Sequence, residues 1–226
     1  MKLRRMAAAL VAASALAAPA CGDSSSSTSS TAAASDALIL GLLVPESGDL
    51  SAIVRSLTEP TKLAVDQINN AGGVNGKPVK LEQADDGSNP TVASTSFDNL
   101  VNGRNVNAIV GPAGSSTALG ILDKIKSKSI PTCSGSTTAA ALSTADSGGY
   151  FFRTAPSDNL QGPALADVVT SDNHTKVGLL VRNDDYGTGF GKAIEEGVKG
   201  SGGTVVASVA YDPQGANFDG EAETRP

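Results

Sequence analysis

The chain has 226 residues, of which 40% are hydrophobic, and a formal net charge of −6. An acidic chain of this kind argues against nucleic acids and anionic membrane surfaces as partners. Its only cysteines are Cys21 and Cys133, so no disulfide framework is expected to hold the fold together.

The chain begins with the features of an export signal. A basic stub, residues 1–5, precedes thirteen uncharged residues, 6–18, that are mostly Ala, Leu and Val. This run is shorter than the about 20 apolar residues that a membrane-spanning helix needs, so residues 1–20 are predicted to be a cleaved signal peptide. Cleavage removes three basic residues and no acidic ones, and would take the net charge from −6 to −9.

A lipid attachment site follows directly. Residues 18–22 read APACG and resemble a bacterial lipobox, in which Cys21 becomes the lipidated first residue of the mature protein. The alternative is ordinary secretion with cleavage near Ala20 and an incidental cysteine. Residues 21–36 then form a Ser/Thr-rich tether with too little apolar surface to fold. The tether favours the anchored form, because an anchored domain must reach away from the bilayer.

Short apolar runs alternate with helix-like stretches from residue 38 on, the pattern of a parallel sheet covered by helices. Strands are predicted at residues 38–44, 77–84, 107–110 and 129–133. The first is apolar at nearly every position and should be buried on both faces, and Cys133 at the end of the fourth should be a small core residue.

Three helices are predicted between these strands, with right-handed crossovers. Asn89 should cap the second helix ahead of Pro90, and Ser115 should open the third. The residues expected to face the core are, helix by helix, Leu57, Thr61, Ala64, Val65 and Ile68; then Ala93, Phe97, Leu100 and Val101; then Ala118, Leu122 and Ile125.

The pattern then restarts. Residues 150–156 are predicted as a strand that leaves the first domain, and Asp158 should open a helix in a capping box with Gln161. A strand at 177–182, a helix at 187–199 and a strand at 204–210 follow. The core-facing residues of these two helices should be Gln161, Leu165, Val168 and Val169, and Phe190, Ala193, Ile194 and Val198.

This pattern predicts an α/β fold with two lobes. The first lobe would span residues 37–156, lacking its later returning segment, and the second lobe would begin at residues 157–226. The few residues after 219 cannot close a doubly wound domain, so we expect a C-terminally truncated chain with an incomplete second lobe.

Six short motifs stand in a characteristic order: GLLVPESG at 41–48, AVDQINNAGGVNG at 64–76, DD at 85–86, GP at 111–112, FRTAPSD at 152–158 and DYG at 185–187. Together they resemble the branched-chain amino-acid binding proteins of the type I periplasmic-binding family, also called extracellular ligand-binding receptors. The resemblance implies a two-lobed fold of parallel sheets flanked by helices. It also implies an exported, lipid-anchored protein that delivers an amino acid or similar small zwitterion to an ABC importer permease, without a cofactor, a metal or a catalytic residue.

The resemblance also assigns four ligand contacts. The hydroxyl of Ser115 and the N–H groups of the helix start would hold the ligand carboxylate, as the orphan N–H groups and the helix dipole permit. Thr138 would add its hydroxyl and N–H, and the carbonyl of Ser136 would accept from the ligand ammonium. Tyr186 would close over the ligand from the second lobe. The plainer alternatives are that Ser115 is only an N-cap and that residues 134–138 form a polar surface turn.

The sequence also departs from the family pattern. Ile53 stands where the family places an aromatic residue, and Ser88 and Gly114 stand where it has the two cysteines of a disulfide. The acidic residue that meets the ligand ammonium in the family is expected beyond Pro226.

The sequence gives less support to other functions. Residues 187–192 (GTGFGK) lack the spacing of a phosphate loop and should be a loose helix start. A secreted hydrolase is poorly supported, because the sequence has no Gly-x-Ser-x-Gly elbow and only one histidine, His174. Asp85 and Asp86 should shape a turn. The alternative that the protein is a ligand-sensing regulator of the same fold stays open. A permease gene next to its own gene would indicate a transport protein instead.

Overall fold

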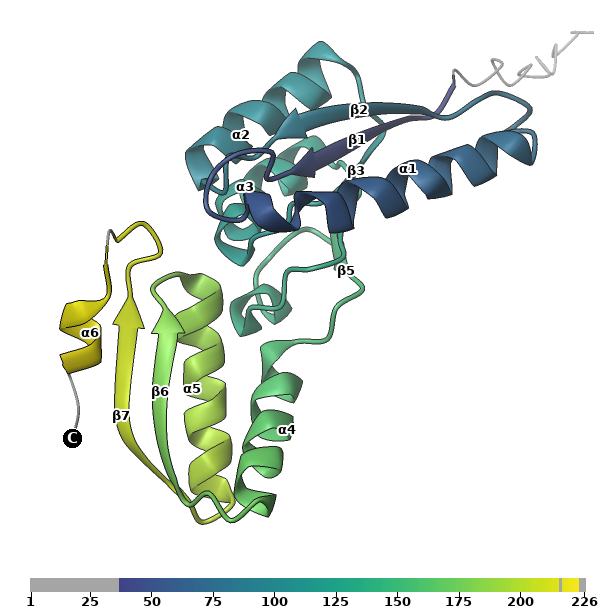
Figure 1. The fold of residues 1–226 in the computed structure, drawn as a ribbon. Helices are drawn as coiled ribbons and strands as arrows, with labels where there is room; N and C mark the ends of the chain where they lie inside the picture. The colour runs from purple at the N-terminus through teal and green to yellow at the C-terminus, as the bar shows by residue number, and fades with distance from the viewer. Residues whose placement is uncertain (1–36, 216, 224–226) are drawn as a thin grey trace, which may run out of the picture. The chain divides into compact units, whose positions relative to one another are not determined.

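The computed structural model describes residues 37–215 and 217–223, so the predicted signal peptide, the tether and Cys21 lie outside the described residues (Figure 1). The described part contains a five-stranded sheet of order β2-β1-β3-β4-β5 and a two-stranded sheet of β6 and β7. None of the helices in this part combines the length and the hydropathy needed to cross a bilayer.

All strand pairs of the larger sheet are parallel, as predicted. The strands are β1 (Ile39–Val44), β2 (Lys80–Asp85), β3 (Ala108–Val110), β4 (Thr132–Ser134) and β5 (Phe151–Arg153). β1 lies between β2 and β3, and its last four residues are buried, which confirms the prediction of a strand covered on both faces. Cys133 lies in β4 as expected, but it is only half-buried.

Three predicted boundaries are wrong by several residues. β2 begins at Lys80 because Val74 and Lys77 first pair with each other in a tight turn, at N–O distances of 2.9 and 3.0 Å. β5 covers only three residues of the predicted strand at 150–156, and β4 begins three residues later than predicted.

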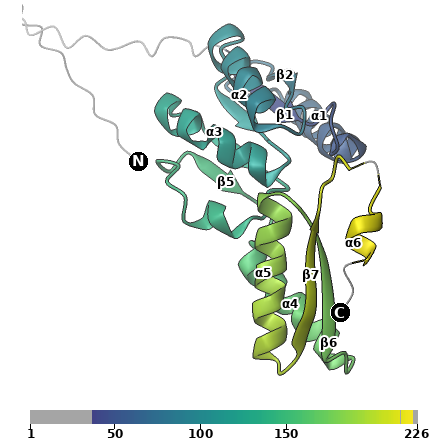
Figure 2. The same cartoon turned by 90° about the vertical axis from the view of Figure 1, so that its left-hand side faces the viewer.

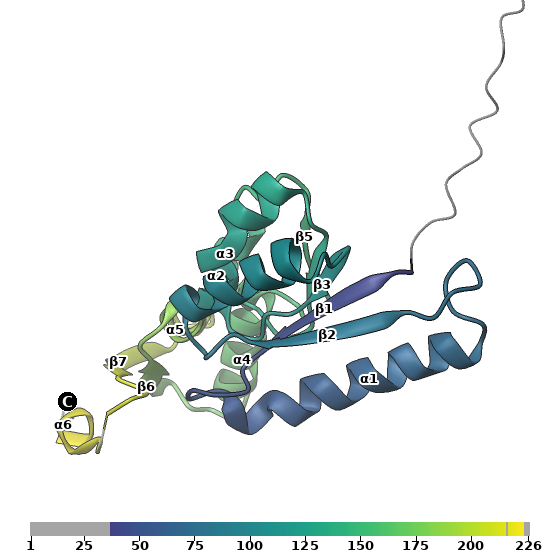
Figure 3. The same cartoon turned by 90° about the horizontal axis from the view of Figure 1, so that it is seen from above.

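Helices cover both faces of the larger sheet (Figure 3). α1 (Val54–Asn70) lies on one side, and α2 (Pro90–Asp98) and α3 (Ser115–Lys128) lie on the other. Asn89 caps α2 as predicted, since its side chain accepts from the N–H groups of Thr91 and Val92 at 2.8 and 3.3 Å. The core between the sheet and the pair α2 and α3 consists of Leu43, Ala93, Phe97, Leu100, Val106, Ile109, Ile121, Leu122 and Ile125.

The predicted inner face of α1 is partly wrong. Val65 is buried, but Ala64 and Ile68 are exposed, and Thr58 is buried instead. α1 packs on β1 and β2. The hydroxyl of Thr58 donates to the carbonyl of Val54 at 2.8 Å, so this polar group is buried with a partner.

The smaller sheet is covered by α5 (Asp185–Gly200), which contacts both β6 (Lys176–Arg182) and β7 (Thr204–Tyr211). α4 (Asp158–Ser171) packs along α5, and a short helix, α6 (Asp219–Glu223), follows β7 (Figures 1 and 2). The apolar core of this part is Ala166, Ile194 and Val198. The lobe boundaries at residues 37, 156 and 157 stay a prediction.

The predicted inner face of α4 is wrong. Leu165 and Val168 are exposed, whereas Gly162 and Ala166 are buried. The reason is the close approach of α5: a Cβ atom on Gly162 would lie 2.5 Å from the Cβ of Ala193. A side chain as large as leucine cannot occupy such a seam.

The start of α4 also differs by one residue. Ser157 is the N-cap and accepts from the N–H of Asn159 at 3.3 Å. Gln161 donates to Asp158 Oδ1 at 3.4 Å, but Asp158 is itself the first helical residue, so the expected capping box is absent.

The seam between α4 and α5 generates a stability prediction. Gly162→Ala should lower the free energy of unfolding by about 1–3 kcal/mol, because the added methyl overlaps Ala193 and its backbone. Gly189→Ala in α5 is the matched control. A Cβ there meets no atom within 4 Å, and the change should leave stability unchanged or raise it by up to about 1 kcal/mol. Urea denaturation measures both, and equal effects of the two substitutions would contradict the packing account.

Candidate functional site

The loop after β3 brings the start of α3 to the edge of the sheet. Gly111 turns the chain out of β3 with φ +115°, and a Cβ there would lie 2.0 Å from the carbonyl oxygen of Leu43. Only glycine fits both the torsion and the contact. The turn places residues 111–115 beside the loop after β4, at the carboxyl end of a parallel sheet, where such sheets bind ligands.

A single buried hydroxyl ties the two loops together. Ser134 Oγ donates to the carbonyl of Pro112 at 2.7 Å and accepts from the N–H groups of Ser136 and Thr137 at 3.3 and 3.1 Å. The hydroxyl of Ser136 adds a bond to the carbonyl of Ala113 at 2.9 Å. The loop that precedes α3 and the loop after β4 are therefore held as one unit.

Ser115 faces this unit from the first turn of α3. Gly114 is the N-cap, so the reading of Ser115 as a simple N-cap is wrong. Ser115 is 4% exposed, and its hydroxyl accepts from the N–H groups of Thr138 and Ala139 at 3.3 and 3.2 Å. Because a hydroxyl can donate one hydrogen bond as well as accept two, Ser115 can still donate to a ligand.

A pocket of about 160 Å³ lies at this helix start. It is lined by Leu50, Ile53, Ala113, Gly114, Ser115, Ser136, Arg182, Asp184 and Tyr186. Three of the four residues predicted to bind ligand, Ser115, Ser136 and Tyr186, therefore line one pocket. Thr138, the fourth, is linked to it through its hydrogen bond with Ser115.

A second, mainly apolar cavity of about 240 Å³ shares Ala113 and Ser136 with the first. Its other lining residues include Leu42, Val44, Leu57, Pro60, Val110 and Pro112. The polar start of α3 therefore lies next to a cavity with mainly apolar walls.

Tyr186 forms the aromatic part of the pocket wall. It lies in the first turn of α5 and stacks on Phe190, with ring centroids 5.7 Å apart. Burial, followed by the negative charges of Asp158 and Asp184, raises the pKa of Tyr186. Its phenol therefore stays neutral and can donate a hydrogen bond at physiological pH.

Asp158 lies behind the site, next to Thr138, and the sequence alone did not indicate this position. It is fully buried, and its backbone N–H donates to the carbonyl of Thr138 at 2.9 Å. Two buried side-chain oxygens, Asp158 Oδ2 and Thr138 Oγ1, have no hydrogen-bond partner within bonding geometry. Burial raises the pKa of Asp158, while the neighbouring Thr138 hydroxyl and the Arg153 charge act the other way. The Thr138 hydroxyl and the Asp158 carboxylate are therefore close enough to interact with each other, and neither residue lines the pocket at the start of α3.

The sequence contained one signal for this residue. Asp158 ends FRTAPSD, one of the motifs that carry the family resemblance, but the residue itself predicts only the start of a helix. Its burial depends on the loop 134–139 folding back over it, and nothing local in the sequence shows that.

Asp85 and Asp86 shape a turn, as predicted. Asp85 accepts from the N–H groups of Ser47 and Gly87 at 3.1 and 2.7 Å, and Asp86 accepts from the N–H of Ser88 at 2.8 Å. Burial would raise the pKa of Asp85, but these bonds and the Ser47 hydroxyl hold it below its ordinary value. The turn fixes the loop that leads into Leu50 on the pocket wall.

Two other features of the sequence have a defined place in the fold. Residues 187–192 lie inside α5, whose start is capped by Asp184 accepting from the N–H of Gly187 at 2.7 Å. His174 is exposed in the turn before β6. Among residues 37–215 and 217–223, no three histidine, cysteine or acidic side chains gather to hold a metal ion.

Comparison with known proteins gives a consistent result. The family model described as periplasmic binding protein matches residues 38–224. The chain is 29% identical over 182 residues to the Leu/Ile/Val-binding protein BraC3 of Rhizobium johnstonii, a match that covers 80% of this chain and 49% of that one. The chain spans about half the length of the curated relatives it matches.

Solved structures show the same fold. The branched-chain amino acid transporter substrate-binding protein LivJ of Streptococcus pneumoniae, solved with isoleucine, is 28% identical with a TM-score of 0.75, covering 84% of this chain and 55% of that one. A solute-binding protein of an ABC transporter from R. palustris, solved with benzoate, shares the fold at 22% identity and a TM-score of 0.76, covering 83% of this chain and 52% of that one. The chain belongs to the periplasmic binding protein family and is related to its branched-chain amino-acid binding members.

Proposed function

We propose that this protein is an extracytoplasmic solute-binding protein that captures a small, uncharged-side-chain amino acid and delivers it to an ABC importer permease. In this proposal Cys21 carries the lipid that anchors it to the membrane. The observation that carries the proposal is the pocket at the start of α3, where Ser115, Ser136 and Tyr186 come together.

The anion half of the site fits an α-carboxylate. The first N–H groups of a helix have no partner within the helix, and the helix dipole adds partial positive charge at the same place. The Ser115 hydroxyl lies among these groups and lines the pocket. The N–H of Thr138, now bonded to Ser115, belongs to the same cluster of donors.

The cation half fits an α-ammonium. The Asp158 carboxylate is buried beside the Thr138 hydroxyl, and in this proposal the positively charged ligand group approaches it. The carbonyl of Ser136 can accept from the same group. A ligand with both charges gains from both halves, whereas an aromatic acid such as benzoate would gain only from the first.

The pocket walls favour an apolar ligand side chain. Leu50 and Ile53 line the pocket at the helix start, and the adjoining cavity is lined mainly by aliphatic carbons. The relatives BraC3 and LivJ carry names that refer to branched-chain amino acids, which agrees with this chemistry. Binding and release by a change between open and closed states require no catalytic residue.

Removal of the anchoring hydroxyls should weaken binding. Ser115→Ala and Thr138→Ala should each reduce the affinity for L-leucine by about 1–3 kcal/mol, because each removes a hydrogen bond to a charged group. Isothermal titration calorimetry measures the change. Ser127→Ala, on the exposed far end of α3, is the matched control and should bind as the wild type does. Unchanged affinity in both site variants would refute the assignment of Ser115 and Thr138 as ligand contacts.

The Asp158 assignment predicts a pH dependence. An ammonium ion binds the ionised carboxylate, and the pKa of Asp158 lies above its ordinary value because of burial. Affinity for L-leucine should therefore fall as pH is lowered through that raised pKa, at a higher pH than an exposed aspartate would show. Asp158→Asn should weaken binding about 10–100-fold at neutral pH and flatten this part of the profile.

Benzoate distinguishes the two ligand classes in the same titrations. For a ligand without an ammonium group, Asp158→Asn should leave affinity equal or improve it, because a buried negative charge is removed. Tight benzoate binding together with no measurable leucine binding would replace the amino-acid proposal by one for aromatic acids.

A further inference from the structure

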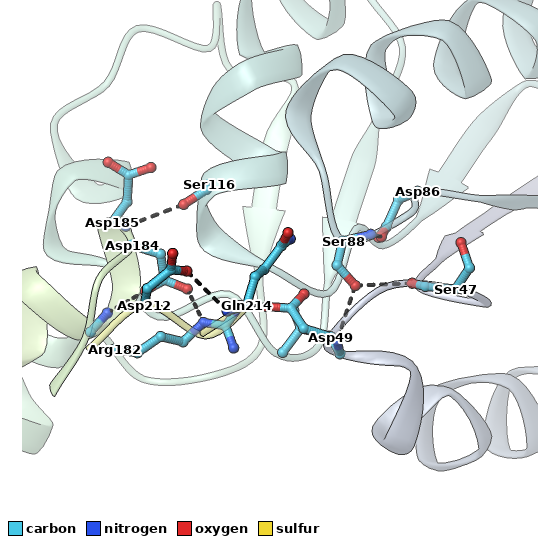
Figure 4. A network of polar contacts seen from close by, with 12 residues as sticks. Ser47, Asp49, Asp86, Ser88, Ser116, Arg182, Asp184, Asp185, Asp212 and Gln214 are labelled. Atoms are coloured by element: carbon cyan, nitrogen blue, oxygen red, sulfur yellow. Dashed lines mark hydrogen bonds and ion pairs between the residues drawn. The ribbon is translucent and has the colours of Figure 1, made fainter. Parts of the chain in front are cut away.

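An ion-pair cluster stands beside the pocket (Figure 4). Arg182, the last residue of β6, binds Asp49 from the loop after β1 through one amino group and Asp184 through Nε. The side chains of Arg182 and Asp49 are 19% and 17% exposed. Ion pairs that are partly removed from water are screened less by salt than surface pairs, so this one can contribute more than the usual surface pair.

The Asp49 side of the cluster is rigid. Gly48 has φ +83°, and a Cβ there would lie 2.4 Å from the carbonyl oxygen of Gly87. Ser88 Oγ donates to the carbonyl of Ser47 and accepts from the N–H of Leu50, both at 3.0 Å (Figure 4). The Asp49 carboxylate is thus presented from a loop fixed to the end of β2, and Leu50 of that loop lines the pocket.

The Arg182 guanidinium is also held in a fixed position. Asp184 uses Oδ2 for Arg182 and Oδ1 for the N–H of Gly187, so the residue that orients the guanidinium also caps α5. Burial alone would lower the pKa of Arg182, but its two carboxylate partners raise it, so the group stays charged. A second contact joins the same parts, since the N–H of Asp185 donates to Ser116 Oγ at 3.2 Å. Tyr186 follows directly in the chain.

The ion pair joins two segments that line one pocket. Leu50, next to Asp49 in the chain, lines it, and so do Arg182 and Tyr186. Because two carboxylates already compensate its charge, Arg182 is not free to serve as a counter-ion for the ligand. We propose that the Asp49–Arg182 ion pair is a latch that holds Tyr186 against the ligand pocket and slows ligand release. This inference rests on the proposed function, and both residues act as positioning residues.

The test is ligand release from the full native chain carrying Asp49→Asn, measured by stopped flow with L-leucine. The dissociation rate should rise about 5–30-fold, while the association rate changes less than about twofold. Raising the salt concentration should speed release from the wild type and narrow its difference from the variant. Asp49→Glu should restore slow release. The matched control is Asp146→Asn, which breaks the exposed pair with Lys126 away from the pocket and should leave release unchanged.

Two results of this release experiment would overturn the latch. One is a dissociation rate in Asp49→Asn equal to that of the wild type and of Asp146→Asn. The other is a variant whose faster release persists in Asp49→Glu and is matched by an equal loss of stability in the ligand-free protein, which would indicate a general structural role.

A ligand-free experiment separates the latch from the proposed function. Hydrogen–deuterium exchange should be faster at residues 184–190 in Asp49→Asn than in the wild type, although the substitution lies in the loop after β1. If no variant binds leucine, the proposed function fails, and the exchange result still decides whether Asp49 restrains the start of α5. Unchanged exchange at residues 184–190 would refute the latch.

Discussion

The hydrogen bonds of the buried Ser134 hydroxyl are the constraint on which the site depends. One oxygen atom, with no exposure to solvent, joins the carbonyl of Pro112 to two N–H groups of the loop after β4. This junction sets the distance between the start of α3 and Thr138, and through Thr138 the position of Asp158. A short polar side chain is suited to the task, because loops carry many backbone groups that must be paired when they are buried.

The strands of this fold could be predicted from sequence, but the helix faces could only partly be predicted. β1 is apolar at nearly every position, and that pattern admits few structures other than a strand covered on both sides. The inner faces of α1 and α4 depend on how closely each helix approaches its neighbour. Gly162 is buried for this reason, and hydrophobicity alone points away from both Gly162 and the buried Thr58.

The same distinction holds for the site. Ser115, Ser136 and Tyr186 could be predicted from the resemblance to the family, and the structure brings them to one pocket. Asp158 was missed because its burial arises from a loop that folds over it. The contact of Asp49 with Arg182 joins residues 133 positions apart, and no local pattern in the chain could indicate it. Local sequence thus shows which groups are available, while long-range packing decides which of them meet.

The seam between α4 and α5 has a mechanical consequence. Gly162, Ala166, Ala193 and Gly197 meet there, and none of them has a rotamer to change. Packed helices normally slide past each other through small side-chain rearrangements, which glycine and alanine cannot make. These two helices are therefore expected to move together as one rigid unit. Asp158 and Tyr186 stand at the same ends of the two helices. Whatever displaces one of them therefore carries the other along, and the spacing between the negative charge and the aromatic ring is preserved through the motion.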